Sequence, residues 1–68
     1  MPELIINGKT ESFDPLPESV LALMKAIGLD PDATLAEVDG EIVSRAAATM
    51  RKLEPGNKIE LVRFVGGG

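Results

Sequence analysis

The sequence predicts an α+β fold in which a mixed sheet of four to five strands packs on one main helix. Three observations lead to this prediction: a hairpin signal at Asn7-Gly8, one amphipathic helical stripe within residues 18–28, and an apolar strand pattern over residues 58–65. The strands are too few for a sandwich, so the helix has to cover one face of a single sheet.

The N-terminal hairpin is the first predicted element. Residues 3–7, Glu-Leu-Ile-Ile-Asn, form an apolar strand, and residues 9–13 form the returning strand. Asn7-Gly8 between them is the strongest short hairpin signal, because both residues tolerate a positive φ. Side chains alternate along a strand, so Ile5 points away from the face that its two neighbours share.

The main helix is predicted within residues 18–28, after the strand-breaking Asp-Pro-Leu-Pro segment that ends at Pro17. Ser19 is a suitable N-cap, although Pro17 could instead be the first helical residue. Gly28 has the place of a residue that ends a helix in the left-handed conformation. The apolar side chains follow the spacing of one helix face, namely Val20, Leu23, Met24 and Ile27.

Shorter elements follow the helix. Residues 29–32 are predicted to be a loop, and two short strands over residues 34–38 and 41–43 flank a turn at Asp39-Gly40. Residues 44–53 contain alanines with good helix propensity, which indicates a helical turn. Another turn is expected over residues 54–57, where proline and glycine are adjacent.

The last strand is predicted over residues 58–65, with Ile59 and Leu61 on one face and Val62 and Phe64 on the other. We expect this strand to lie beside the first strand in the middle of the sheet, with both running in the same direction. A parallel return requires a crossover connection, which the main helix provides.

Composition excludes several classes of function. The 68 residues contain neither cysteine nor histidine, which removes thiol chemistry, the usual general base and the commonest metal ligand. The net charge of −4, with seven dispersed Lys and Arg residues, argues against nucleic-acid binding. No apolar stretch is long enough to span a bilayer, and the N-terminus has no secretory signal. We therefore expect a cytoplasmic protein, monomeric alone, without a bound cofactor.

The C-terminal triglycine is the feature that indicates chemistry. We expect residues 1–65 to form the domain and Gly66, Gly67 and Gly68 to form a thin, flexible tail that ends in a carboxylate. A carboxylate is a poor electrophile and needs activation, most simply as an acyl-adenylate made with ATP. The chain has no phosphate-binding loop, so a separate enzyme would activate it. If the chain carries sulfur covalently, the carboxylate is the evident place, since cysteine is absent. The alternative is a tail without a function.

Several segments together resemble a known family. The chain has that family's length, and its strand 4–7 ends in Asn. Residues 42–45, Ile-Val-Ser-Arg, resemble a segment of that family. Residues 55–61 resemble the family's turn and the start of its last strand. Gly67-Gly68 is the most specific element. On these residues the whole chain resembles the sulfur carriers of thiamine biosynthesis, the ThiS type. It is more loosely similar to the small subunit of molybdopterin synthase.

The resemblance implies a ubiquitin-like β-grasp fold and a carrier rather than an enzyme. It implies that Gly68 is adenylated by an E1-like adenylyltransferase of the ThiF type, which uses ATP, and is then converted to a thiocarboxylate. The sulfur would go to a thiazole synthase of the ThiG type. Three alternatives stay open: a molybdopterin-type carrier, a β-grasp module that binds partners without covalent chemistry, and a modifier joined to lysines.

A binding surface beside the tail is also expected. Ile5, Val62 and Phe64 point away from the core face, so they could form one apolar patch that leads to the tail. Exposed apolar patches commonly mark protein interfaces. Arg63, between Val62 and Phe64, could pair with an acidic group of a partner. We therefore predict a partner-binding role for Ile5, Val62, Arg63 and Phe64.

Overall fold

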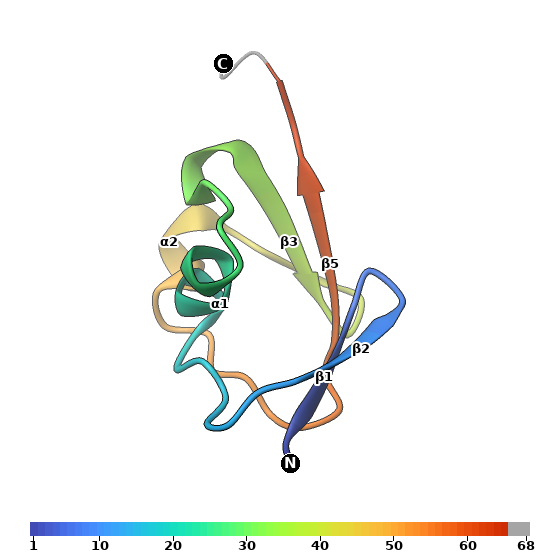
Figure 1. Cartoon of the computed structure of the whole chain (residues 1–68). Coiled ribbons are helices and arrows are strands. Elements are labelled where there is room, and N and C mark those ends of the chain that lie inside the picture. The colour runs from blue at the N-terminus through green and yellow to red at the C-terminus, as the bar shows by residue number, and fades with distance from the viewer. Residues whose placement is uncertain (66–68) are drawn as a thin grey trace.

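A computed structural model describes residues 1–65, while Gly66, Gly67 and Gly68 lie outside the described residues. Within residues 1–65, five strands form one mixed sheet in the order β2-β1-β5-β3-β4, and the helices lie on one side of it (Figure 1). This arrangement confirms the predicted fold class. The elements are β1 (Glu3–Ile6), β2 (Lys9–Ser12), α1 (Val20–Ala26), the 3-10 helix η1 (Pro31–Ala33), β3 (Thr34–Val38), β4 (Glu41–Val43), α2 (Arg45–Ala48) and β5 (Lys58–Arg63).

The last strand, β5, is the centre of the sheet. It runs parallel to β1, with Ile6 opposite Ile59, and antiparallel to β3, with Val38 opposite Ile59. The predicted parallel pairing of the first and last strands is therefore confirmed. The segment that leads to the C-terminus therefore starts from the central strand of the sheet.

The β1–β2 turn also ties β1 to β5. Asn7 and Gly8 both have positive φ values, 50° and 81°, as a two-residue hairpin turn requires. The Asn7 side chain then reaches β5, where its Nδ2 donates to the Leu61 carbonyl at 3.1 Å and its Oδ1 accepts from the Leu61 N–H at 2.8 Å. This side-chain amide continues the β1–β5 ladder beyond the end of the β1 backbone.

Helix α1 begins and ends as the sequence predicts. The Ser19 hydroxyl accepts a hydrogen bond from the Ala22 N–H at 3.1 Å, which satisfies one free N–H of the first turn. At the other end Gly28 has a φ of 82°, the left-handed conformation that glycine adopts without steric cost. The helix buries Val20, Leu23 and Met24, the inward part of its predicted stripe.

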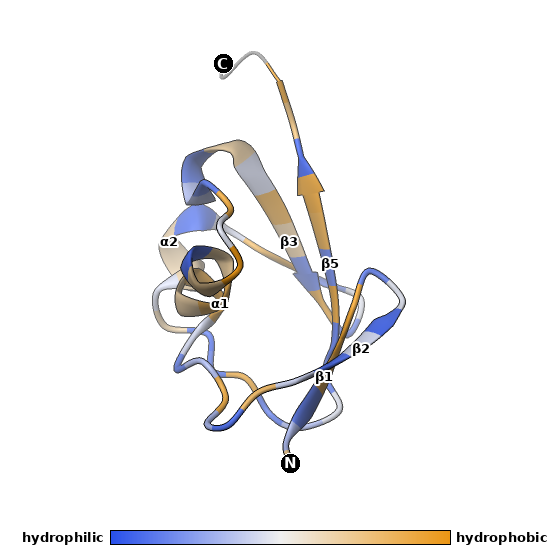
Figure 2. Cartoon of the chain, in the orientation of Figure 1, coloured by the Kyte–Doolittle hydropathy of each residue, from blue (hydrophilic) through white to orange (hydrophobic). Residues whose placement is uncertain are grey.

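The hydrophobic core lies between α1 and the inward face of the sheet. Figure 2 shows apolar residues on α1 and along β5, the two elements that face each other across it. Burying these aliphatic side chains is the main favourable term in folding. The largest side chains that are fully buried are Leu4, Val20, Leu23, Val38 and Ile59.

Several boundaries differ from the sequence-based expectation, and β1 and β2 each end one residue earlier than expected. The predicted loop 29–32 contains the start of η1, where the Asp30 side chain accepts from the Asp32 N–H and Pro31 is the first residue. Within residues 44–53 only α2 is helical. The strand β5 ends at Arg63 instead of residue 65, although the Phe64 N–H still donates at 3.0 Å to the carbonyl of Ala33, the last residue of η1 before β3.

Candidate functional site

The point where the chain leaves the sheet is the first part of the site. Figure 1 shows the end of β5 extending beyond the helices. The Phe64 N–H still donates to the Ala33 carbonyl, but Val65 is 99% exposed. Contact with the fold therefore ends at Phe64 in the described part of the chain. The predicted tail residues Gly66, Gly67 and Gly68 lie outside that part, and the boundary at residue 65 stays a prediction.

The second part of the site is the sheet face that α1 does not cover. Directly paired residues of neighbouring strands share a face of the sheet, and on this face such pairs form two adjacent rows of side chains. In one row Leu35 of β3 is opposite Val62 of β5. In the other row Glu37 of β3 lies between Glu60 of β5 and Ile42 of β4. We call these five residues the open-face patch.

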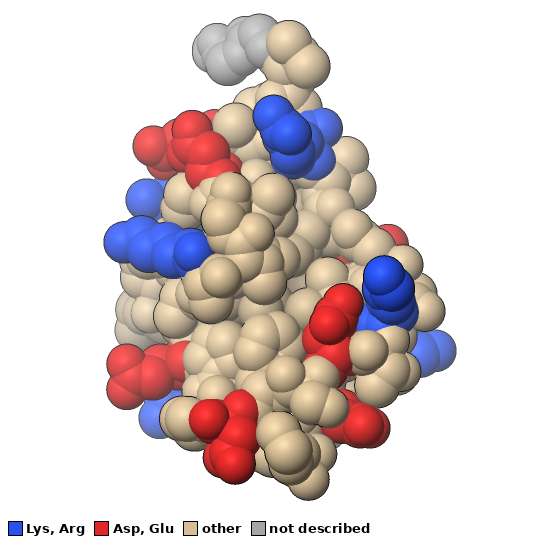
Figure 3. Space-filling view, in the orientation of Figure 1, with Lys and Arg blue, Asp and Glu red and all other residues tan. Residues whose placement is uncertain are grey.

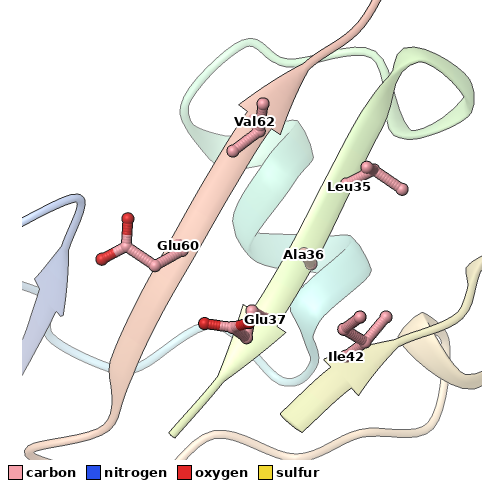
Figure 4. Close-up of a pocket in the computed structure, with 6 residues that line it drawn as sticks. All are labelled: Leu35, Ala36, Glu37, Ile42, Glu60 and Val62. Carbon is pink, nitrogen blue, oxygen red and sulfur yellow. The ribbon is translucent and has the colours of Figure 1, made fainter. Parts of the chain in front are cut away.

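The open-face patch is largely apolar and accessible. Leu35 and Val62 are 55% and 56% exposed, and Ile42 is 76% exposed. Together with Glu37, Glu60 and Ala36 these side chains line a hollow of about 330 Å³, and Figure 4 shows how they lie along the three strands. Exposed aliphatic side chains gathered in this way are typical of a surface that a partner covers.

Ile5 is on the same side of the sheet but apart from this patch. It pairs with Thr10 on β2 and with Lys58 on β5, and Val62 lies four positions further along β5. At about 3.3 Å per residue, that is a separation of about 13 Å along the strand. The predicted alternation is therefore right, whereas the single apolar patch expected from Ile5, Val62 and Phe64 is not found, because Ile5 lies apart from Val62. A role of Ile5 in partner binding stays a prediction.

Phe64 borders the patch from the end of the sheet. Its side chain, 39% exposed, lines a second hollow of about 190 Å³ that also includes Leu35 and Ile42. Since those two residues line both hollows, they connect Phe64 to the open-face patch. Arg63 lies opposite Thr34 of β3 and forms no ion pair within residues 1–65. The partner-binding roles of Val62, Arg63 and Phe64 also stay predictions.

Leu35 and Ile42 are the site residues that sequence reasoning missed. The signal for Leu35 was present, because Thr34, Ala36 and Val38 alternate with it and are buried. Its position next to Val62 depends on the pairing of β3 with β5, which the local sequence does not specify. Ile42 is opposite Glu37 through the hairpin of β3 and β4, so its position relative to Val62 also depends on the pairing of β3 with β5.

Charges are dispersed over the domain. Figure 3 shows acidic and basic side chains scattered over the face in view, with no large patch of either sign. The ion pairs of residues 1–65 are Arg45–Asp32 at 2.8 Å and Arg51–Glu41 at 2.7 Å, both at the surface. Those residues contain no group of three or more Asp or Glu side chains placed to hold a metal ion, and none of their helices is long and apolar enough to cross a membrane.

Comparison with known proteins gives concordant results. The model of the ThiS family matches residues 4–68. The crystal structure of the thiamine biosynthesis protein ThiS from Geobacter metallireducens has a TM-score of 0.82 and 28% identity, covering 97% of this chain and 99% of that chain. The solution structure of a thiamine biosynthesis protein from the same organism has a TM-score of 0.78 and 28% identity, covering 97% and 87%.

A longer relative matches as well. A thiazole synthase of Paramagnetospirillum magneticum is 33% identical over 66 residues, which are 97% of this chain and 20% of that protein. The chain thus spans about a fifth of the length of this curated relative. The family match over residues 4–68 and the shared β-grasp architecture confirm the resemblance seen in the sequence: the chain belongs to the ThiS family.

Proposed function

We propose that this chain is a sulfur carrier of thiamine biosynthesis and that the carboxylate of Gly68 holds the sulfur. The observation that supports this most is that the family match continues through Gly68, directly beyond the central strand β5. In this proposal the domain supplies the docking face, and Gly66 and Gly67 add no side chain between it and the Gly68 carboxylate. A tail without side chains could enter a narrow catalytic pocket that would exclude larger residues.

The proposed chemistry has two steps. The Gly68 carboxylate attacks the α-phosphate of ATP, which forms an acyl-adenylate and releases pyrophosphate. A sulfur nucleophile at the oxidation level of sulfide then attacks the acyl carbon, and AMP leaves with the bonding electron pair. The product is a thiocarboxylate. Because the chain has no histidine, no cysteine and no phosphate-binding loop, we assign both steps to a separate E1-like adenylyltransferase of the ThiF type.

We assign thiazole synthase as the sulfur acceptor. The Paramagnetospirillum relative that carries the name thiazole synthase contains a segment similar to nearly this whole chain. Joining a carrier and its acceptor in one polypeptide raises their effective concentration for each other. A separate chain with the same role would instead rely on a docking surface, for which the open-face patch is our candidate.

The proposal is tested by reconstitution with the ThiF-type adenylyltransferase of the same organism, ATP and a sulfide source. The intact mass of the chain should rise by about 16 Da, since one acyl oxygen is replaced by sulfur after activation of the carboxylate. A chain whose Gly68 carboxylate is blocked as an amide is the control and should keep its mass. The proposal would be contradicted if the mass of the full chain stayed unchanged while the same adenylyltransferase modified another carrier.

A second measurement addresses the pathway. The thiocarboxylate form should support thiazole formation by thiazole synthase and should not support molybdopterin formation by the large subunit of molybdopterin synthase. Sulfur transfer to the molybdopterin enzyme alone would refute the assignment to thiamine biosynthesis while leaving the carrier chemistry in place.

A further inference from the structure

Two acidic residues occupy directly paired strand positions in the open-face patch. Glu37 and Glu60 are paired residues of the neighbouring strands β3 and β5. Directly opposed residues of an antiparallel pair have Cβ atoms about 5 Å apart, and like charges at such positions destabilise the sheet. Both residues line the same hollow as Leu35, Ile42 and Val62, and Figure 4 shows the Glu60 side chain directed away from β3.

The fold does not neutralise this pair. The ion pairs of the described residues involve Asp32 and Glu41, so neither Glu37 nor Glu60 takes part in one. Lys58 occupies the same face two positions before Glu60, but it forms no ion pair within residues 1–65 either. The domain thus keeps two acidic residues in paired positions without an ion-pair partner among residues 1–65, and a single substitution would remove one of the two charges.

The apolar neighbours determine which occupant suits this surface. Covering Leu35, Ile42 and Val62 would release water from them, but it would also remove water from the two carboxylates between them. A buried charge that is left unpaired is strongly unfavourable. A purely apolar surface would leave both charges unpaired, and a second copy of this chain would add its own glutamates. Nucleic acid would add phosphates.

We infer that the open-face patch docks a protein that places an arginine or lysine between Glu37 and Glu60 and apolar side chains against Leu35, Ile42 and Val62. An arginine suits the pair best, because its planar guanidinium donates several hydrogen bonds to carboxylates at once. The inference rests on the proposed function in one respect: thiazole synthase is the partner that carries this basic side chain.

The test measures stability and binding on the same variants. Glu37→Gln and the double variant Glu37→Gln/Glu60→Gln remove charge with little change in shape. With fewer like charges at the pair the melting temperature should stay the same or rise by about 1–4 °C. The affinity for the thiazole synthase of the same organism, measured by calorimetry, should fall about tenfold or more, and binding should depend less on salt.

Matched variants separate a local effect from one of net charge. Glu11→Gln on the exposed strand β2 removes the same charge outside the patch and should bind like the unsubstituted chain. Glu37→Lys places opposite charges at the pair, so it should raise the melting temperature and weaken binding further. A gain in stability together with a loss of binding would indicate that Glu37 and Glu60 serve partner binding and not the stability of the fold.

Three results would overturn the inference: no binding by the unsubstituted chain, an affinity of the glutamine variants within about twofold of the control, or lost binding with a lowered melting temperature. The last result would mean that Glu37 and Glu60 stabilise the fold instead of serving a partner. The proposed function is assessed in a separate mixture that contains the adenylyltransferase but no thiazole synthase. The measurement there is the mass increase of the chain. A mass increase with unchanged binding would refute the inference alone, and a missing increase with lost binding would refute the proposed carrier chemistry alone.

Discussion

The side chain of Asn7 connects β1 to the central strand, and its removal should be costly for so small a domain. Asn7→Ala deletes the two hydrogen bonds to the Leu61 backbone, at 3.1 and 2.8 Å, in a partly buried place. Each is worth about 0.5–1.5 kcal/mol net. Alanine must also adopt the positive φ of 50°, at about 1–2 kcal/mol. The expected loss of unfolding free energy is therefore about 2–5 kcal/mol.

That loss is a large fraction of the total. A chain of 68 residues at about 0.05–0.15 kcal/mol per residue has an unfolding free energy of about 3–10 kcal/mol. Urea unfolding should be followed by far-UV circular dichroism, because the chain has no Trp or Tyr to report by fluorescence. Asn7→Gly is the control: it adopts a positive φ freely, so it should lose about 1–3 kcal/mol, the hydrogen-bond part alone.

The reasoning would be refuted if Asn7→Ala stayed within about 0.5 kcal/mol of the unsubstituted chain, the usual range of surface substitutions. Equal losses for the alanine and glycine variants would refute the backbone part of the estimate. In that case the two hydrogen bonds would account for the whole effect.

The other predictions concern the helix ends, the surface ion pair and the patch. Ser19→Ala removes the N-cap and should lower the unfolding free energy by about 1 kcal/mol. Gly28→Ala should lower it by about 1–2 kcal/mol through backbone strain alone, since no atom lies within 4 Å of the added Cβ. Urea titration measures both losses. Arg45→Gln should change stability by less than about 0.5 kcal/mol, because its ion pair with Asp32 is exposed, and a larger loss would contradict that view. Ile42→Ser changes a position that is 76% exposed, so it should leave the melting temperature nearly unchanged and weaken binding to thiazole synthase. Unchanged binding in calorimetry would show that Ile42 takes no part in docking.

Local patterns in the sequence were sufficient for most of the fold. The Asn7-Gly8 turn and the helix stripe that ends at Gly28 depend on backbone preferences and periodicity over a few residues. The parallel pairing of the first and last strands followed from handedness and connection rules, since α1 provides the crossover. The turn and the helix stripe are properties of neighbouring residues, whereas the strand pairing depended on these general rules.

The site was harder to predict because it depends on contacts between distant segments. Nothing near Leu35 or Ile42 indicates that β3 lies beside β5, so their position next to Val62 could not be predicted. The pair of Glu37 and Glu60 was missed for the same reason, because the two residues are far apart in the sequence and become neighbours only through strand register. Ile5 was placed on the correct face but too near Val62, since alternation gives the face and not the distance along the strand.

The central claim is that the C-terminal acyl group of Gly68 carries the sulfur. Its most direct test is tandem mass spectrometry of the C-terminal peptide after the ATP-dependent reaction with the adenylyltransferase. We predict that the gain of about 16 Da is confined to fragment ions that contain Gly68, because an activated carboxylate is the group attacked. A mass gain on an internal residue, or a C-terminal peptide of unchanged mass from a fully active reaction, would contradict the account.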